Sequence, residues 1–145
     1  MIKYTSSIND IMVENLDGFF VGWVKPLSSE KHYLHLSKCV NFVAALDDSK
    51  VVGFVSAISD GIGCASIPLI EVLPQYQKQG IGSELMSHML EILNGFYTID
   101  LMCDKNVQGF YERFGMKKLT GMGLRKVLCV FGGRCSMWLN QSEQR

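Results

Sequence analysis

The stretch from Ile67 to Leu93 constrains this chain most, because it joins an apolar strand to an amphipathic helix through a short loop with two glycines. The run from Ile67 to Leu73 is apolar and is followed by Pro74, which predicts a buried strand that ends there. Around Gly80 and Gly82, apolar residues begin to recur with the spacing of one helix face, at Ile81, Leu85, Met89 and Ile92. The glycines therefore lie at a helix N-terminus, where backbone N–H groups and the helix dipole favour an anion. This order of elements is typical of a pyrophosphate site.

Spacing separates the phosphate-binding loops that could stand here. A nucleotide P-loop needs lysine and then serine or threonine directly after its last glycine, whereas Ser83 and Glu84 follow Gly82. A dinucleotide fingerprint that begins at Gly80 needs glycine or alanine at position 85, which is Leu85. What remains is an ordinary glycine turn or another kind of anion-binding loop.

Two motifs in this order resemble the GNAT acyltransferase superfamily. The first is Gln77-Lys78-Gln79-Gly80-Ile81-Gly82, a Gln-x-x-Gly-x-Gly segment that follows a strand. The second runs from Asn106 through Tyr111 to Gly115 and Met116, and it matches the family's Asn-x-x-x-x-Tyr-x-x-x-Gly-Phe segment with methionine in place of phenylalanine. The motifs lie about one strand and one helix apart, and the resemblance covers about residues 40 to 125.

The resemblance implies an α/β (α+β) GNAT fold, with a central mixed, mostly antiparallel sheet of roughly six to seven strands flanked by about four helices. It also implies acetyl-CoA as the cosubstrate. Tyr111 would then be the general acid that protonates the coenzyme thiolate, the Val72 N–H would polarise the acetyl carbonyl, and Asn106 would contact the pantetheine arm. The residues that would hold the pyrophosphate are Gln77, Lys78, Gln79, Gly80, Ile81, Gly82 and Ser83.

Acetyl transfer to an amine also needs a base, because an amine with a pKa of about 10.4 is protonated at neutral pH. Glu71 is the first candidate for this catalytic role, since a charged residue in an otherwise apolar strand needs a partner or a wet cleft. It could instead pair with a cation or face solvent. Some family members place their base earlier in this strand, at the position of Ser66, which cannot act unaided. Asp100 and Asp104 are the reserve carboxylates.

The whole chain has 145 residues, with 14 Lys and Arg against 14 Asp and Glu, so no long-range field favours nucleic acid or an anionic membrane. No apolar run approaches the ~20 residues that span a bilayer, and the start Met-Ile-Lys-Tyr-Thr lacks an apolar signal segment, so we expect a cytoplasmic protein. The five cysteines lack the paired spacing of a zinc site and are expected to be reduced core thiols. We expect no metal site, because no third ligand accompanies His32 and His35, and His88 lies elsewhere.

We expect a single GNAT domain over residues 1–145. The predicted strands are 2–5, 41–46, 50–58, 64–73, 97–103, 116–119 and 121–126, and the predicted helices include 8–16, 28–38 and 79–93. The strands from 41 to 73 form an antiparallel meander, and strand 97–103 returns parallel to strand 64–73. The apolar segment 127–139 packs on the sheet or on a second copy, so a homodimer is one expected assembly.

The leading hypothesis is an N-acetyltransferase that acts on a primary amine of a small molecule or peptide through a ternary complex. A non-catalytic acyl-CoA sensor is the first alternative, and it would need the loop but neither Tyr111 nor Glu71. A protein lysine or N-terminal acetyltransferase is the second, and it would need an open groove. The aromatic residues Phe19, Phe20 and Trp23 either line an acceptor pocket or fill the core.

Overall fold

The structure of the protein is a computed structural model that describes residues 1–124. The chain forms two compact units. The first comprises Met1–Phe19 and Leu27–Cys103, and the second comprises Phe20–Pro26 and the chain from Asp104 onward. The single domain over residues 1–145 stays a prediction.

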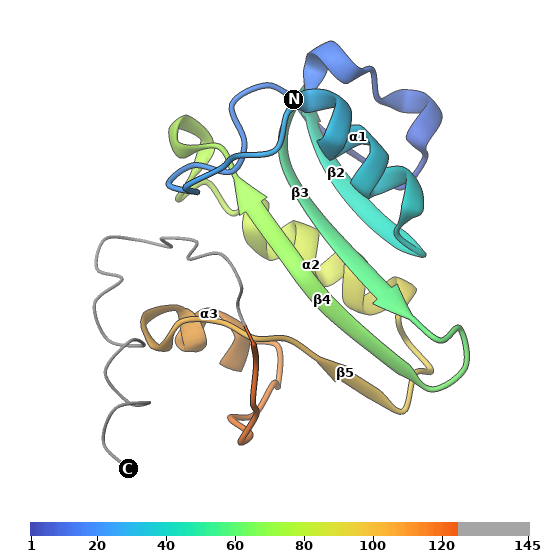
Figure 1. Ribbon diagram of the computed structural model, residues 1–145, viewed down its shortest axis with the longest axis vertical. Coiled ribbons are helices and arrows are strands. Elements are labelled where there is room, and N and C mark those ends of the chain that lie inside the picture. The colour runs from blue at the N-terminus through green and yellow to red at the C-terminus, as the bar shows by residue number, and fades with distance from the viewer. Residues whose placement is uncertain (125–145) are drawn as a thin grey trace. The chain divides into compact units, whose positions relative to one another are not determined.

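The first unit is built on a sheet of five strands in the order β1-β2-β3-β4-β5 (Figure 1). Strands β1 to β4 pair antiparallel, and β5 runs parallel to β4. The strand bounds are Ile2–Thr5 (β1), Asn41–Asp47 (β2), Lys50–Ser59 (β3), Cys64–Val72 (β4) and Thr98–Asp100 (β5). The mixed, mostly antiparallel sheet is therefore confirmed, as is the parallel return of the last strand.

Two connections set this topology. The β2–β3 hairpin turns at Asp48, whose φ of 53° is a left-handed conformation that aspartate tolerates better than most residues. Parallel strands cannot be joined by a hairpin, so β4 and β5 need a crossover, which α2 (Ile81–Ile92) provides. Because α2 forms this crossover, its N-terminus follows the end of β4 in the chain, after the loop between Val72 and Ile81.

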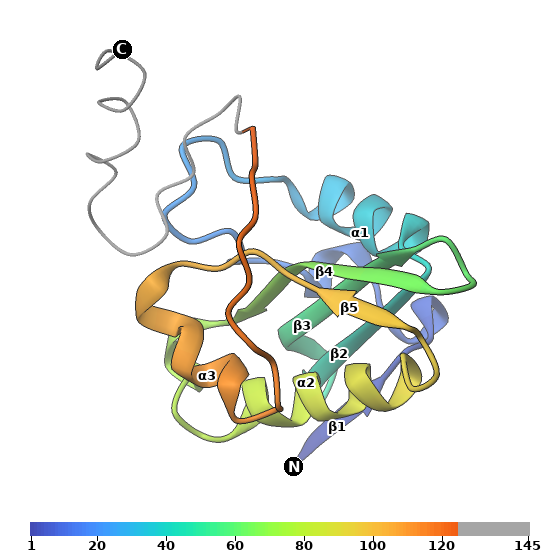
Figure 2. The ribbon, with the colours of Figure 1, turned by 90° about the horizontal axis from the view of Figure 1, so that it is seen from below.

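Helices cover both faces of the sheet in the first unit, and Figure 2 shows α1 (Ser29–Lys38) and α2 on opposite sides. His32 of α1 packs on Phe54 of β3 with ring centroids 4.3 Å apart. On the other face, a Cβ at Gly53 would lie 3.1 Å from the Leu85 side chain of α2. The side chains that α2 buries are Ile81, Leu85, Met86 and Met89. Each such burial contributes roughly 1.5–3 kcal/mol, which fixes α2 against the sheet.

The two helices predicted for the N-terminal third have different outcomes. The second is confirmed as α1, and its cap is Ser28, whose Oγ accepts a hydrogen bond from the Lys31 N–H at 3.3 Å. The first, over residues 8–16, is wrong, because the chain forms two 3-10 turns, η1 (Ile8–Asp10) and η2 (Val13–Asn15). Asn and Asp side chains compete with helical hydrogen bonds, and Asp10 instead accepts a hydrogen bond from the Thr5 hydroxyl.

The second unit contains the 3-10 turn η4 (Lys105–Val107) and the short helix α3 (Gln108–Glu112). Phe110 is central to it, with its ring centroid 5.0 Å from that of Tyr111 and 5.4 Å from that of Phe114. A helix this short is not stable through its own hydrogen bonds alone, and edge-to-face contacts of this kind stabilise it further. The segment that contains Tyr111 is therefore helical.

The predicted closing strands 116–119 and 121–126 are wrong as far as the structure describes them, because residues 116–124 form no strand. Gly121 and Gly123 weaken β propensity, and Lys118 forms an ion pair with Glu112 at 3.0 Å. Residues 1–124 thus hold five strands instead of the six to seven predicted, and three α-helices instead of about four, while the fold class is confirmed. None of these helices is long and apolar enough to cross a membrane. The segment 127–139 lies outside the described residues.

Candidate active site

The parallel strands β4 and β5 pair over only a short length. Although β4 spans Cys64–Val72, its pairing with β5 runs only from Cys64↔Thr98 to Ser66↔Asp100. Pro68 follows, and proline has no N–H to donate to a neighbouring strand. Figure 1 shows the two strands together at one end of β4 and diverging toward the other. The later half of β4 therefore has an edge that β5 does not occupy.

The hydrogen-bond pattern determines which backbone groups point into this opening. The Leu73 N–H donates to the Val52 carbonyl at 2.9 Å, so this N–H faces β3. Because successive peptide groups of an antiparallel strand point to opposite sides, the N–H groups of Val72 and Ile70 point away from β3. The Val72 carbonyl, on the same side, accepts a hydrogen bond from Gln77 Nε2 at 3.0 Å. The Val72 N–H is thus a donor directed into the opening.

A loop with two left-handed residues leads from this edge into α2. After the 3-10 turn η3 (Pro74–Tyr76), Lys78 has a φ of 60° and Gly80 a φ of 86°. The left-handed conformation costs a non-glycine residue roughly 1–2 kcal/mol, and strain of this kind gathers at functional sites. Gly80 precedes α2, and a Cβ there would meet no atom within 4 Å. Open space therefore lies in front of a helix N-terminus.

Two further side-chain hydrogen bonds hold the loop in shape. Gln79 Nε2 donates to the Gln75 carbonyl at 3.1 Å. The Tyr76 hydroxyl donates to the Asp47 carboxylate at 3.0 Å, and this bond ties the loop to the β2–β3 hairpin. Sequence reasoning missed the second bond, because a pair separated by 29 positions leaves no periodic signal. The loop is therefore held by its own side chains as well as by the strand and helix around it.

Glu71 lies on the α1 face of the sheet. It pairs with Phe54, which packs against His32 of α1, and directly paired residues of antiparallel strands project to the same face. The Glu71 side chain is half-buried there. Ser66, the alternative base position that cannot act unaided, pairs with the reserve carboxylate Asp100 at the end of β5, nearer the start of β4. Of the candidate carboxylates, Glu71 thus lies on the stretch of β4 that opens, and Asp100 lies at the end of β5 where the pairing with β4 stops.

Tyr111 and Asn106 belong to the second unit. Asn106 is exposed within η4, and Tyr111 lies in α3. Asp104 directly precedes η4. The predicted site residues from Glu71 to Ser83 are therefore brought together by the first unit, whereas the roles of Tyr111 and Asn106 are part of the proposal below.

The comparison with known protein families decides to which class this arrangement belongs. The profile of the Acetyltransferase (GNAT) family matches residues 8–116, which is most of the chain. The chain belongs to the GNAT family. The resemblance that the two motifs predicted is therefore confirmed.

Individual proteins of the GNAT type agree with this assignment. An uncharacterised N-acetyltransferase, ycf52 of Porphyra purpurea, is 34% identical over 122 residues, which cover 81% of this chain and 70% of that protein. The crystal structure of a candidate acetyltransferase from Deinococcus radiodurans R1 is 42% identical, with a TM-score of 0.83 and coverage of 86% of this chain and 88% of that one. A GNAT-family acetyltransferase from Streptococcus pneumoniae TIGR4 is 32% identical, with a TM-score of 0.70 and coverage of 86% and 98%.

His32 of this GNAT protein lies in the hydrophobic core. Among residues 1–124 no group of three or more His, Cys, Asp or Glu side chains could hold a metal ion. The His32 ring lies 5.1 Å from that of Phe19 and 4.3 Å from that of Phe54. Burial, with a smaller effect of His35, lowers the pKa of His32 from 6.5 to about 4. His32 is thus a neutral core residue, and Phe19 belongs to the same core.

Proposed function

We propose that this GNAT protein is an acetyl-CoA-dependent N-acetyltransferase that acts on a primary amine of a small molecule or peptide by direct attack in a ternary complex. The observation that carries the proposal is the opening beside β4, with the Val72 N–H directed into it and the start of α2 close behind in the chain. An open strand edge suits an extended chain with amide groups, and a helix N-terminus suits a diphosphate. Acetyl-CoA carries both groups in one molecule.

The chain's own residues fit such a ligand. Lys78 and the N–H groups from Gln77 to Ser83 would bind the diphosphate, and Asn106 would contact the pantetheine arm. The N–H groups of Ile81 and Gly82 are the principal donors, because the first residues of a helix have no intrahelical acceptor. The Ser83 N–H also donates to the Gly80 carbonyl at 3.0 Å, so it would be a shared donor.

Three groups of the chain would handle the charge and the protons. Acetyl-CoA supplies the acetyl thioester, whose carbonyl carbon is the electrophile. The Val72 N–H donates to the carbonyl oxygen, where negative charge develops. Glu71 accepts the proton that the amine nitrogen loses as the C–N bond forms. Tyr111 gives its phenolic proton to sulfur as the C–S bond breaks, a transfer that is only slightly uphill because a phenol has a pKa of about 10 and a thiol one of about 8.5.

A screen of amines with acetyl-CoA tests this function. We expect thiol release that depends on the amine, with the acetylated amine identified by mass spectrometry. Tyr97→Phe is a matched control for Tyr111→Phe, because Tyr97 directly precedes β5 and is 92% exposed. Binding of acetyl-CoA without transfer to any amine would instead favour a non-catalytic sensor, and transfer only to folded proteins would favour a protein acetyltransferase.

A further inference from the structure

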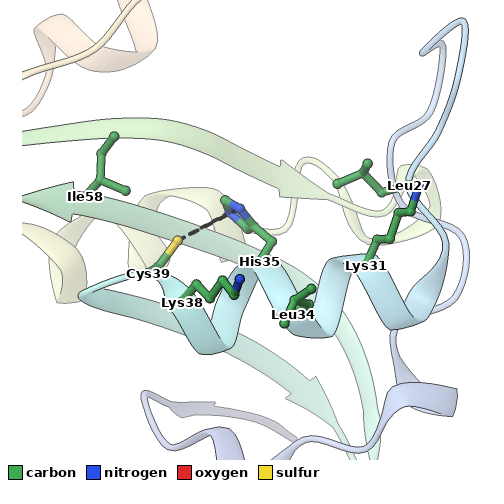
Figure 3. A pocket seen from close by; sticks show the side chains of 7 residues that line it. All are labelled: Leu27, Lys31, Leu34, His35, Lys38, Cys39 and Ile58. Carbon is green, nitrogen blue, oxygen red and sulfur yellow. Dashed lines mark hydrogen bonds between the residues drawn. The ribbon is translucent and has the colours of Figure 1, made fainter.

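A groove of about 330 Å³ lies beside α1, on the sheet face that also carries Glu71 (Figure 3). The residues of α1 that line the groove lie on one side of the helix, three or four positions apart. They are Lys31, Leu34, His35 and Lys38. The lining is completed by Leu27, from the segment before the helix, by Cys39, directly after the helix, and by Ile58, from β3. All of these residues belong to the first unit.

The charge of this groove has one sign. Lys31 and Lys38 line it, no Asp or Glu lines it, and within residues 1–124 neither lysine forms an ion pair. His35 adds no charge at neutral pH, because burial lowers its pKa, and its Nε2 lies 3.0 Å from Ser56 Oγ. Burial also raises the pKa of the Cys39 thiol, which keeps it neutral. An apolar stem with an anionic group is the complement of such a lining.

The contacts of α1 with β3 give the direction of the groove. His32 packs on Phe54, and one turn later His35 contacts Ser56, so α1 and β3 run in the same direction. Because Phe54 pairs with Glu71, the first turn of α1 is level with Glu71 along the sheet. The last turn is level with the start of β4, since Ile58 pairs with Ser66.

The two lysines therefore lie at different distances from the proposed base. Lys31 is adjacent to His32 in the chain and so lies near the level of Glu71. Lys38 lies two helical turns farther on, roughly 10 Å along the helix axis at 1.5 Å per residue. An acceptor whose nitrogen reaches Glu71 can thus direct its far end along the groove past one lysine to the other.

We propose that the acceptor amine of this enzyme carries a carboxylate or phosphate group on an apolar stem, which Lys31 and Lys38 bind while the amine faces Glu71. The inference rests on the proposed acetyl transfer. A molecule with an ammonium at one end and an anion at the other complements the carboxylate of Glu71 and the two lysines together. A polyamine would bring its second ammonium against the lysines, so the same groove disfavours it.

Matched acceptors test the inference. The probes are ω-amino acids of increasing length, each paired with its neutral carboxamide, and the corresponding ω-aminoalkyl phosphates, which separate carboxylate from phosphate selectivity. We expect kcat/KM to favour the anionic member of each pair, with an optimum length. Lys31→Gln and Lys38→Gln should each reduce this preference by up to about fivefold, the size of an exposed charge interaction. Lys3→Gln, which removes an exposed lysine of β1, should leave it unchanged.

Charge reversal and binding give independent readouts. The double variant Lys31→Glu with Lys38→Glu should favour the carboxamide over the acid, and calorimetry on the protein saturated with coenzyme A should show the same order of affinities without turnover. Equal kcat/KM for acid and carboxamide, or a preference that survives in both Gln variants, overturns the anionic acceptor while acetyl transfer stands. Normal acetyl-CoA binding without transfer to any amine overturns the proposed function, and this inference with it.

Discussion

At the scale of single residues, the proposed chemistry separates cofactor binding from proton transfer, and Tyr111 belongs only to the second. We predict that Tyr111→Phe lowers kcat by about a hundredfold or more, the usual contribution of a positioned acid. Its affinity for acetyl-CoA should stay within about twofold, because the phenol acts on the sulfur that leaves. Thiol release measures the first quantity and calorimetry the second. Wild-type turnover in this variant would remove Tyr111 from the mechanism.

A second residue-scale prediction concerns stability and pH. Burial lowers the pKa of His32 to about 4, whereas the unfolded chain keeps about 6.5. Below pH 6.5 the unfolded state therefore binds a proton that the native state does not bind until about pH 4. The free energy of unfolding thus decreases as the pH falls from 6.5 to 4, and the contribution of His32 is fully present above pH 6.5. The contribution of His32 between pH 7 and 5 is about 2 kcal/mol.

Urea unfolding at the two pH values checks this sign. The His32→Leu variant should lose less stability on acidification than the wild type, because the apolar side chain has nothing to protonate. The control is His88→Gln, which replaces a half-exposed histidine of α2 and should keep the wild-type dependence. The same slope in His32→Leu and wild type would contradict the assignment of the effect to His32.

At the scale of elements, the strand, loop and helix around the two glycines could be predicted because their signals are local. The predicted strand 64–73 and helix 79–93 differ by no more than two residues per end from Cys64–Val72 and Ile81–Ile92. The N-terminal cap of α1 at Ser28 could be predicted from the sequence for the same reason. The direction of the Val72 N–H and the Tyr76–Asp47 hydrogen bond could not be predicted from the sequence. The first depends on the pairing of β4 with β3, and the second on the position of the β2–β3 hairpin.

The Tyr76–Asp47 bond leads to a prediction about the loop. Tyr76→Phe removes the donor, so the loop loses an anchor and the Kd for acetyl-CoA should rise about fivefold, the value of one hydrogen bond, with kcat little changed. Asp47→Ala should reproduce this effect, whereas Asp47→Asn keeps an oxygen acceptor and should restore most of the affinity. Equal affinities across the three variants would show that the bond does not support the loop.

The glycine loop leads to a second element-scale prediction. Gly82→Trp places a large side chain on the first turn of α2 and should abolish detectable acetyl-CoA binding by calorimetry. Ser87→Trp introduces the same residue at an exposed position of the same helix and should leave the affinity intact. Circular dichroism would verify that both variants keep the fold. Retained affinity in Gly82→Trp would place the diphosphate elsewhere.

At the scale of the whole molecule, the sequence predicted the family and fold class, while its errors lie in segments whose structure depends on distant partners. Residues 8–16 carry apolar residues that suit a helix, yet their Asn and Asp side chains and the Thr5 contact favour turns. Residues 116–124 resemble strands in composition but find no pairing within the described chain. The cytoplasmic location, the homodimer and the lack of nucleic-acid partners stay predictions, since they concern surroundings rather than local chemistry.

The central claim is that the edge of β4 that β5 does not occupy binds the thioester arm of acetyl-CoA. Residue-resolved amide hydrogen exchange with and without acetyl-CoA tests it most directly, because neighbouring N–H groups of β4 point in opposite directions. We predict that the Leu73 amide, bonded to Val52, is protected in both states, whereas the Val72 amide becomes strongly protected only when acetyl-CoA is present. Saturating acetyl-CoA that leaves the exchange of Val72 unchanged would contradict the claim.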